Sequence, residues 1–278
     1  MTGAIVAVAG DFHINSTTAL CPPYFDLDDG GSYRASKQQR WIYKQFCAYW
    51  DSVKAARAIH GYPVVAILNG ELADDLNHRS TQLITKNPDD MLRLSVATLA
   101  PMLEVADHII CLRGTEAHAG VSSHIDEAIA RDIDAIPDED DHHARWLFRG
   151  EIAGVTFHVC HHPAMGHARA WTRGGDANRK AAQVIFEYVE MGVQPPALAI
   201  FGHTHKPVDS GDNFSTRVIV LPSWQLSNAF GHKLGGGWLP IGAAYFVCKD
   251  GEYEVHKRFT RWPIKSWKAT KLDLVTTN

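Results

Sequence analysis

The sequence has few of the features that mark exported, membrane-spanning or disordered proteins. It contains five cysteines in 278 residues, an odd number with no Cys-x-x-Cys pair, which predicts reduced thiols in the cytoplasm. No apolar run approaches the roughly 20 residues that a membrane span requires. The opening segment, 1–10, is apolar but lacks the basic start of a signal peptide. We therefore expect a cytoplasmic protein with no membrane partner.

A strong charge of either sign is also lacking. Lys and Arg number 27 and Asp and Glu number 31, so the formal net charge is -4, and no general field draws the chain to nucleic acid. With 45% hydrophobic and 21% charged residues, the composition is that of an ordinary globular protein. Large α/β enzymes often keep this length in one unit, so we expect a single domain over residues 1–278.

Alternating strand and helix patterns predict an α/β fold with a largely parallel sheet in the first half of the chain. Short apolar runs rich in β-branched residues predict buried strands at 4–8, 63–68, 108–112, 155–160, 197–201 and 217–221. Ser36 forms a capping box with Gln39 and predicts a helix start. Further helix starts are predicted at Asn87–Pro88, at Ser122 or Ser123, and at Asp176.

The second half of the chain adds antiparallel strands. Asp250–Gly251 lies between two alternating runs and predicts a tight hairpin, and 151–154 predicts a second turn. Two mixed sheets packed face to face, with helices outside, would accommodate both halves. The segments 15–35, 137–141 and 163–175 carry no strand or helix pattern and are expected to be loops.

Polar motifs follow five of the predicted strands. They are Asp11–His13, Asn69–Asp74, Arg113–His118, His161–Pro163 and Gly202–His205. In α/β sheets, ligands bind just beyond the carboxyl ends of the strands, where side chains from separate loops converge. Imidazoles and carboxylates without a thiolate suit Mn²⁺, Fe or Zn²⁺. The sequence therefore predicts a metal site at this end of the sheets.

Each motif alone has a simpler explanation. Asp11 and His13 could cap a turn or face water, and Glu71 could cap a helix N-terminus, where carboxylates are favoured. His161 and His162 could be a surface pair. The Gly-His-Thr-His motif at 202–205 is more specific, because histidines at i and i+2 after a strand can point into one cavity. All the simpler explanations would have to hold together, in this order, for no site to exist.

The order of these motifs, from Asp11 to His205, resembles that of the calcineurin-like metallophosphoesterase superfamily. The resemblance covers most of the chain and implies a four-layer αββα sandwich of two mixed sheets flanked by helices. It also implies two divalent metal ions, with Mn²⁺ as the first expectation and Fe or Zn²⁺ as alternatives. The ligands it implies are Asp11, His13 and His205 for one ion, His161 and His203 for the other, and Glu71 as the bridge.

Two positions depart from the family pattern. Glu71 stands where the family usually has a bridging Asp, so the carboxylate is kept with one more methylene. The family's Gly-Asn-His-[Glu/Asp] is here Gly114-Thr-Glu-Ala-His118, with Thr115 in place of a metal-binding Asn and Glu116 in place of the proton-donating His. His118 is expected to restore the imidazole, either as proton donor or as a ligand of the second ion. The alternative is a helix-start histidine that faces solvent.

The resemblance implies hydrolysis of a phosphate ester, a phosphodiester or a nucleotide-type substrate, by a hydroxide that bridges the two ions. His118 would protonate the leaving group. Asp74, or its neighbour Asp75, is expected to orient a ligand histidine from behind. Arg169 and Arg173 are expected to contact the substrate phosphate, and a solvated loop at these positions is the alternative.

Two other functions stay open. A nuclease of the same superfamily could contact DNA by stacking and charge through the aromatic and basic segments 171–173 and 257–271, although no DNA-binding domain is recognisable. A non-catalytic metal-binding protein would explain the altered motif at 114–118. Such a protein should bind metal without turnover.

Overall fold

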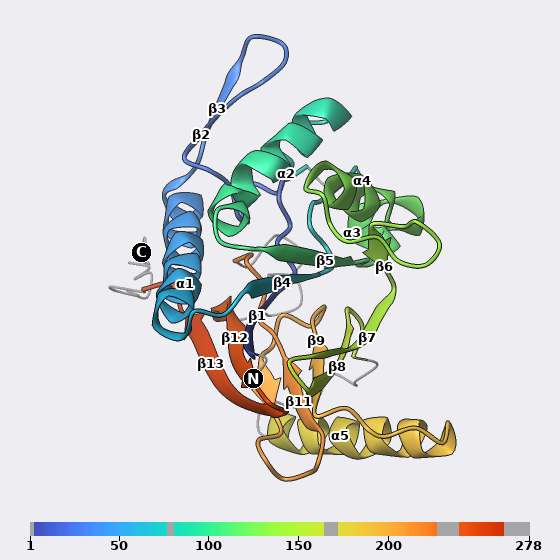
Figure 1. Ribbon diagram of the computed structural model, residues 1–278. Helices are drawn as coiled ribbons and strands as arrows, with labels where there is room; N and C mark the ends of the chain where they lie inside the picture. Colours follow the sequence, from blue (N-terminus) through green and yellow to red (C-terminus); the bar gives the residue numbers. More distant parts are fainter. Residues whose placement is uncertain (1–2, 77–80, 164–171, 227–238, 264–278) are drawn as a thin grey trace, which may run out of the picture.

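Two β-sheets packed face to face form the centre of the molecule, with helices on both outer sides (Figure 1). The computed structural model describes residues 3–76, 81–163, 172–226 and 239–263. The predicted fold class, a four-layer αββα sandwich of two mixed sheets, is confirmed.

The first sheet has six strands in the order β13-β12-β1-β4-β5-β6. Four of them run parallel: β1 (Gly3–Ala9), β4 (Val64–Asn69), β5 (His108–Leu112) and β6 (Ala144–Arg145). The C-terminal hairpin adds β12 (Ile241–Lys249) antiparallel to β1, followed by β13 (Glu252–Thr260). The predicted turn at Asp250–Gly251 is confirmed, and both residues have the positive φ that favours Asp and Gly.

The second sheet has five strands in the order β10-β11-β9-β8-β7. They are β7 (Leu147–Ile152), β8 (Val155–Cys160), β9 (Leu198–Phe201), β10 (Val208–Asp209) and β11 (Arg217–Val220). β8, β9 and β11 are parallel, and only the edge strands β7 and β10 are antiparallel. The antiparallel pattern expected for the second half therefore holds for the edges of this sheet and for the hairpin.

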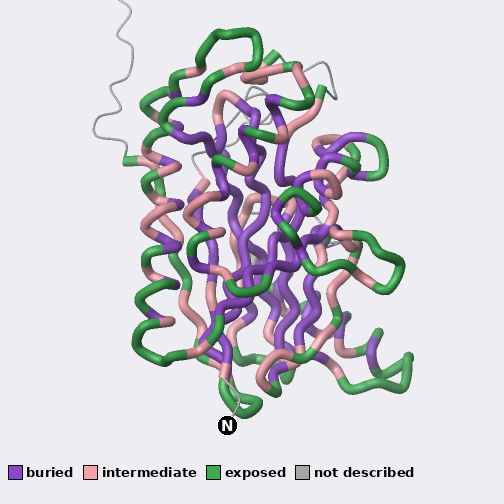
Figure 2. Tube along the Cα trace, turned by 45° about the horizontal axis from the view of Figure 1, so that its top comes forward, coloured by how far each residue is buried: buried purple, intermediate pink, exposed green. Residues whose placement is uncertain are grey.

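Three hydrophobic cores separate the four layers. In β1, Ile5 and Ala7 face the helices, whereas Val6 and Val8 face the second sheet, because successive side chains of a strand point to opposite faces. The first sheet is covered by α1 (Lys37–His60), α2 (Pro88–Leu103) and α4 (His124–Asp132), and the second by α5 (Arg173–Glu190). Buried residues accordingly follow the strands, while the outer helix faces are exposed (Figure 2).

The local predictions succeed where a side chain serves its own helix. Ser36 Oγ accepts from the backbone N–H of Gln39, and the backbone N–H of Ser36 donates to Gln39 Oε1, so the capping box is confirmed. Asn87 likewise caps α2 by accepting from the backbone N–H of Asp89.

The helix start predicted at Ser122 or Ser123 is confirmed, because α4 begins at His124 with Ser123 at its N-cap. The Ser123 hydroxyl does not cap the helix, however, and donates to the carbonyl oxygen of Gly114 at 2.8 Å. Two other local predictions are wrong. α5 begins at Arg173 rather than at Asp176. The segment 15–35, expected to be a loop, contains a hairpin of β2 (Tyr24–Asp26) and β3 (Ser32–Arg34), whose strands are too short to show alternation.

All five cysteines are free thiols. Burial raises the pKa of Cys21 and of Cys248 to about 12, so these thiols stay protonated. Within the described ranges, no helix combines the length and the apolar character needed to cross a bilayer.

Candidate metal centre

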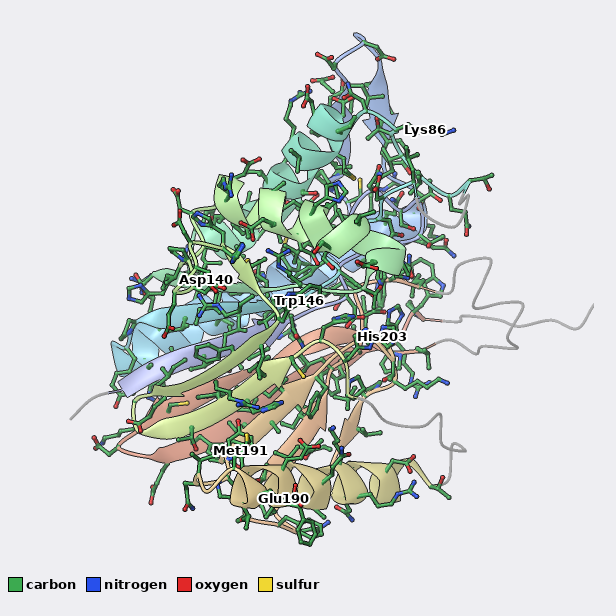
Figure 3. All side chains as sticks on the ribbon, turned by 90° about the vertical axis from the view of Figure 1, so that its right-hand side faces the viewer. Lys86, Asp140, Trp146, Glu190, Met191 and His203 are labelled. Carbon is green, nitrogen blue, oxygen red and sulfur yellow. The ribbon has the colours of Figure 1, made fainter. Side chains whose placement is uncertain are left out.

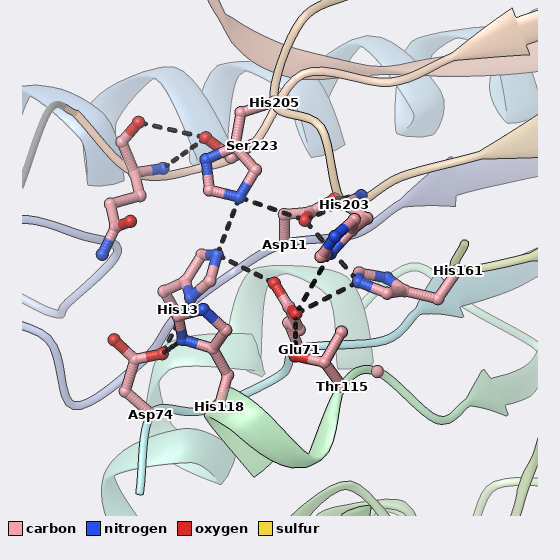
Figure 4. Close-up of polar contacts among 12 residues, drawn as sticks. Asp11, His13, Glu71, Asp74, Thr115, His118, His161, His203, His205 and Ser223 are labelled. Carbon is pink, nitrogen blue, oxygen red and sulfur yellow. Dashed lines mark hydrogen bonds and ion pairs between the residues drawn. The ribbon is translucent and has the colours of Figure 1, made fainter. Parts of the chain in front are cut away.

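The loops that follow five strands bring polar side chains to one end of the two sheets. Figure 3 places His203 at this end, and Figure 4 shows the side chains facing one another. The contributions are Asp11 and His13 after β1, Glu71 after β4, Thr115 after β5, His161 after β8, and His203 and His205 after β9. The predicted convergence of these side chains at the strand ends is thus confirmed.

The backbone of these loops is unusual. Positive φ angles, from 48° to 66°, occur at Asp11, His13, Glu71, His203 and His205. A positive φ costs a non-glycine residue free energy, and such residues occur in turns and are enriched at functional sites. The loops therefore turn sharply at the residues whose side chains meet.

Glycines beside these residues allow the close approach of the loops. A Cβ on Gly202 would lie 2.5 Å from Asp11 Oδ2, and a Cβ on Gly114 would lie 2.4 Å from the backbone nitrogen of Glu71. Neither position has room for a side chain. The first residue of the Gly-His-Thr-His motif and of the Gly-Thr-Glu motif must therefore be glycine, because a larger residue would not fit.

Two buried imidazoles have their tautomers set by acceptors behind them. His13 Nδ1 donates to Asp74 Oδ1 and His161 Nδ1 donates to the Asn69 carbonyl oxygen, both at 2.8 Å. Both acceptors can only accept, so Nδ1 of each ring carries a proton and Nε2 points the other way, toward the carboxylates. His13 Nε2 lies 3.2 Å from Glu71 Oε2, and His161 Nε2 lies 3.2 Å from Glu71 Oε1. Metal-binding histidines are usually oriented in this way.

The candidate ligand atoms form two groups that share Glu71. The first group is Asp11, His13, Glu71 and His205, and the second is Glu71, His161 and His203; within each group the atoms lie within 4.8 Å of one another. In the first, His205 Nε2 lies 3.0 Å from His13 Nε2 and 3.2 Å from Asp11 Oδ1. In the second, His203 Nδ1 lies 3.7 Å from Glu71 Oε1. The two oxygens of Glu71 thus face different groups.

Several buried polar atoms of this centre lack hydrogen-bond partners. Among the described residues, Glu71 Oε2, His161 Nε2 and His203 Nδ1 are buried without a hydrogen bond. An unsatisfied buried group costs about 1–3 kcal/mol, so three together call for a physical explanation. Divalent cations would satisfy all three atoms, and the imidazole and carboxylate donors suit Mn²⁺, Fe or Zn²⁺. The residues therefore fit a pair of metal ions.

The pKa values of Glu71 and His161 are shifted because these buried side chains lie so close together. Burial opposes the charge on Glu71, but His161 and the contacts from His13 and His203 hold the pKa of its carboxyl well below the ordinary value. Burial also opposes the charge on His161, yet Glu71 and Asp11 raise the pKa of its imidazole to about 9. Protons and metal ions would compete for these nitrogens, because a ligand histidine must be neutral.

Asp74 contacts two imidazoles with one oxygen. Asp74 Oδ1 accepts from His13 Nδ1 at 2.8 Å and from His118 Nδ1 at 2.9 Å. Burial opposes the charge of Asp74, but His13 and His118 lower the pKa of its carboxyl to about 2. His118 lies on α3 (Glu116–Ala119) with its ring edge-on to His13 at a centroid distance of 4.6 Å. His118 is therefore tied to the first group through Asp74, whereas Asp75 makes no part of this contact.

Two residues near Glu71 have roles that the sequence does not predict. Thr115 Oγ1 donates to Glu71 Oε1 at 2.5 Å. Asp126, buried on α4, accepts from the backbone N–H of Leu72 at 2.9 Å and of Gly114 at 2.6 Å. Burial raises the pKa of Asp126 to about 6. No signal in the sequence distinguishes it, because an Asp in the first turn of a helix is ordinary.

Two other residues of the motifs do not belong to either ligand group. Glu116 is exposed, and its side chain accepts a backbone N–H from the one-turn helix η2 (Val121–Ser123). His162 is also exposed, with its ring centroid 4.2 Å from that of His203. His161, rather than His162, is turned toward Glu71.

The contacts predicted for the basic residues Arg169 and Arg173 are not tested by the described residues. Arg169 falls in 164–171, outside the described residues, and Arg173 opens α5 with its side chain also outside them. Lys257 lies on β13 and forms an ion pair with Asp209 at 2.7 Å.

Comparison with solved structures finds distant likenesses. A dimetal phosphatase from Danio rerio is 11% identical with a TM-score of 0.47, and the match covers 92% of this chain and 96% of that one. Vps29 from Entamoeba histolytica is 12% identical with a TM-score of 0.40, covering 92% and 99% of the two chains. Vps29 from Chaetomium thermophilum is 8% identical with a TM-score of 0.42, covering 93% and 97%. At these values the activity has to be argued from the site itself.

No protein-family model matches the chain, and no curated protein matches its sequence.

Proposed function

We propose that this protein is a metal-dependent hydrolase of phosphate esters that acts on a phosphodiester or nucleotide-type substrate. The main support for this proposal is the position of Glu71, because its two carboxylate oxygens face two separate groups of imidazoles. A carboxylate shared between two cations is typical of centres that clamp a phosphate. The proposed ligands are Asp11, His13, Glu71, His161, His203 and His205, and Mn²⁺ is the proposed metal.

Bound divalent cations would neutralise charge on the phosphate oxygens and lower the pKa of water, which supplies the nucleophile. The chain itself orients the ligands and moves a proton. Asp74 fixes the ring of His13 through Nδ1. It also accepts from His118 Nδ1, so His118 Nε2 is the nitrogen proposed to donate a proton. Hydroxide, formed when the water loses a proton to solvent, would add to phosphorus as the ester P–O bond breaks, and the leaving oxygen would take the proton from His118 Nε2.

The test is turnover by purified protein supplied with Mn²⁺. Aryl phosphodiester, aryl phosphomonoester and labelled single- and double-stranded DNA are offered in parallel. Hydrolysis of an aryl ester should require metal and should be lost in His203→Ala. His142→Ala is the matched control, because His142 is an exposed histidine whose ring forms an ion pair with Asp138, away from both ligand groups.

Two outcomes would favour the alternatives. Cleavage of DNA without hydrolysis of aryl esters would indicate a nuclease. Tight metal binding with no turnover under Mn²⁺, Fe²⁺ or Zn²⁺ would indicate a non-catalytic metal-binding protein. That alternative is favoured by the exposed position of Glu116 and by Thr115 standing where an Asn ligand was expected.

A further inference from the structure

Thr115 is placed to act on Glu71 rather than on its own helix. It occupies the N-cap position of α3 but makes no capping hydrogen bond with its side chain. Its hydroxyl donates instead to Glu71 Oε1 at 2.5 Å. A threonine at an N-cap normally satisfies a free backbone N–H of the helix. The hydroxyl of Thr115 therefore serves the shared carboxylate.

The surroundings hold this contact in place. Gly114 packs so closely on Glu71 that a Cβ there would lie 2.5 Å from Glu71 Cγ. Asp126 accepts from the backbone N–H of Gly114 and of Leu72, which ties the loop after β5 to the loop after β4. Glu71 has a φ of 53°, so its stem leaves a strained turn with little freedom to move. The Thr115 hydroxyl then fixes the one part that could still rotate, the carboxylate.

The two ligand groups are unequal in number and exposure. Among the His, Cys, Asp and Glu side chains of the described residues, the group of Asp11, His13, Glu71 and His205 offers four, and the group of Glu71, His161 and His203 offers three. His203 is also the most open of the six, with 38% of its side chain exposed against 25% for His205. Fewer ligands and more water weaken the hold on a cation.

We propose that Thr115 is a positioning residue that fixes Glu71 between the two groups, and that the His161–His203 position is the weaker, more readily exchanged cation position. This inference rests on the proposed two-metal function. The Thr115 hydroxyl keeps Glu71 Oε1 turned toward His161 and His203. Because this position has one ligand fewer, a cation there would depend more strongly on Glu71. Loss of the hydroxyl should therefore affect the weaker position most.

The experiment is a Mn²⁺ titration of the full chain, first stripped of metal, by calorimetry and by the electron paramagnetic resonance of free Mn²⁺. The unaltered protein should bind two ions with dissociation constants at least about tenfold apart. Thr115→Val keeps the shape and removes the hydroxyl, and should weaken the second ion by about 10- to 100-fold, the usual effect of losing a partner behind a ligand. Thr115→Ser restores the hydroxyl and should restore binding.

Variants of the two groups assign the positions. His203→Ala should leave one tightly bound ion, whereas His205→Ala should weaken the tight one. Two equal dissociation constants, or a Thr115→Val isotherm that matches the unaltered protein, would overturn the inference and leave the proposed function standing. No Mn²⁺ binding by the unaltered protein would instead overturn the proposed function. Circular dichroism of each metal-free variant establishes that it is folded.

Discussion

Two clusters of charged side chains in this molecule differ in whether their charges are matched. At the edge of the second sheet, Asp209 accepts from Arg217 at 2.9 and 3.0 Å and from Lys257 at 2.7 Å. At the strand ends, Asp11 and Glu71 face imidazoles instead, and three buried polar atoms there have no hydrogen bond among the described residues. The Asp209 cluster has its charges matched within the chain, whereas the strand-end cluster has donor atoms that could hold a cation.

A lowered pKa does not by itself separate these clusters. Burial opposes the charge of Asp209, yet the hydrogen bonds from Arg217 and Lys257 lower the pKa of its carboxyl to about 2. The pKa of Asp74, beside the candidate metal centre, is also lowered to about 2. What distinguishes the centre is its unsatisfied atoms together with the positive φ of its loops. Structural ion pairs perturb pKa values as strongly as functional sites do.

The largest expected effect is the loss of activity when the shared carboxylate loses its charge. Glu71→Gln keeps the shape of the side chain and should lower kcat/KM by about 1000-fold or more, since both cations depend on Glu71. Asp209→Asn is the same change of charge in the other cluster and should leave kcat/KM within about twofold. Steady-state kinetics with an aryl phosphoester measures both. Equal losses in the two variants would remove the distinction between the clusters.

The second effect is stabilisation by metal. Each Mn²⁺ ion, at about 100 times its own dissociation constant, should raise the free energy of unfolding by about 2.7 kcal/mol, because only the folded chain assembles the ligands. Thermal unfolding with and without chelator measures this increment. Asp209→Asn should retain the increment and Glu71→Gln should lose most of it. An increment that survives in Glu71→Gln would place the metal elsewhere.

The third effect is on stability without metal. Asp209→Asn should lower the free energy of unfolding by roughly 2 kcal/mol, because Arg217, only 17% exposed, loses the less exposed of its two carboxylate partners and keeps Asp212 at 3.1 Å. Lys257→Met should cost less than about 1 kcal/mol, because Lys257 is 36% exposed and its pairing is screened by water. Urea unfolding in chelator ranks the two variants. The reverse order would contradict the assignment of Arg217 as the main partner.

The last expected effect is a pH dependence of the strand-end cluster. The pKa of His161 is raised from 6.5 to about 9, so its stabilising charge is fully present below pH 6.5 and is lost as the pH rises through 9. In chelator, the unfolding free energy should therefore fall across this interval. Saturating Mn²⁺ should reduce the fall, because the cation replaces the proton on Nε2. A fall of the same size with and without metal would argue against competition at His161.

The sequence predicts well the parts of this molecule that depend on local patterns. The strands at 108–112 and 155–160 are found at the predicted residues, because each apolar run is bounded by polar motifs. The candidate ligands could be named because each follows a predicted strand, namely β1, β4, β8 or β9. Asp126 and the contact between Thr115 and Glu71 could not, since both depend on how α4 and the loop after β5 pack against the loop after β4.

Anomalous diffraction at the manganese absorption edge can show whether two cations share Glu71. Crystals of the unaltered protein grown with Mn²⁺ should show two anomalous peaks, one on each side of the Glu71 carboxylate. One should lie among Asp11, His13 and His205, and the other beside His161 and His203. An absence of peaks at Glu71, or a single peak that contacts only one of the two groups at saturating Mn²⁺, would contradict the account.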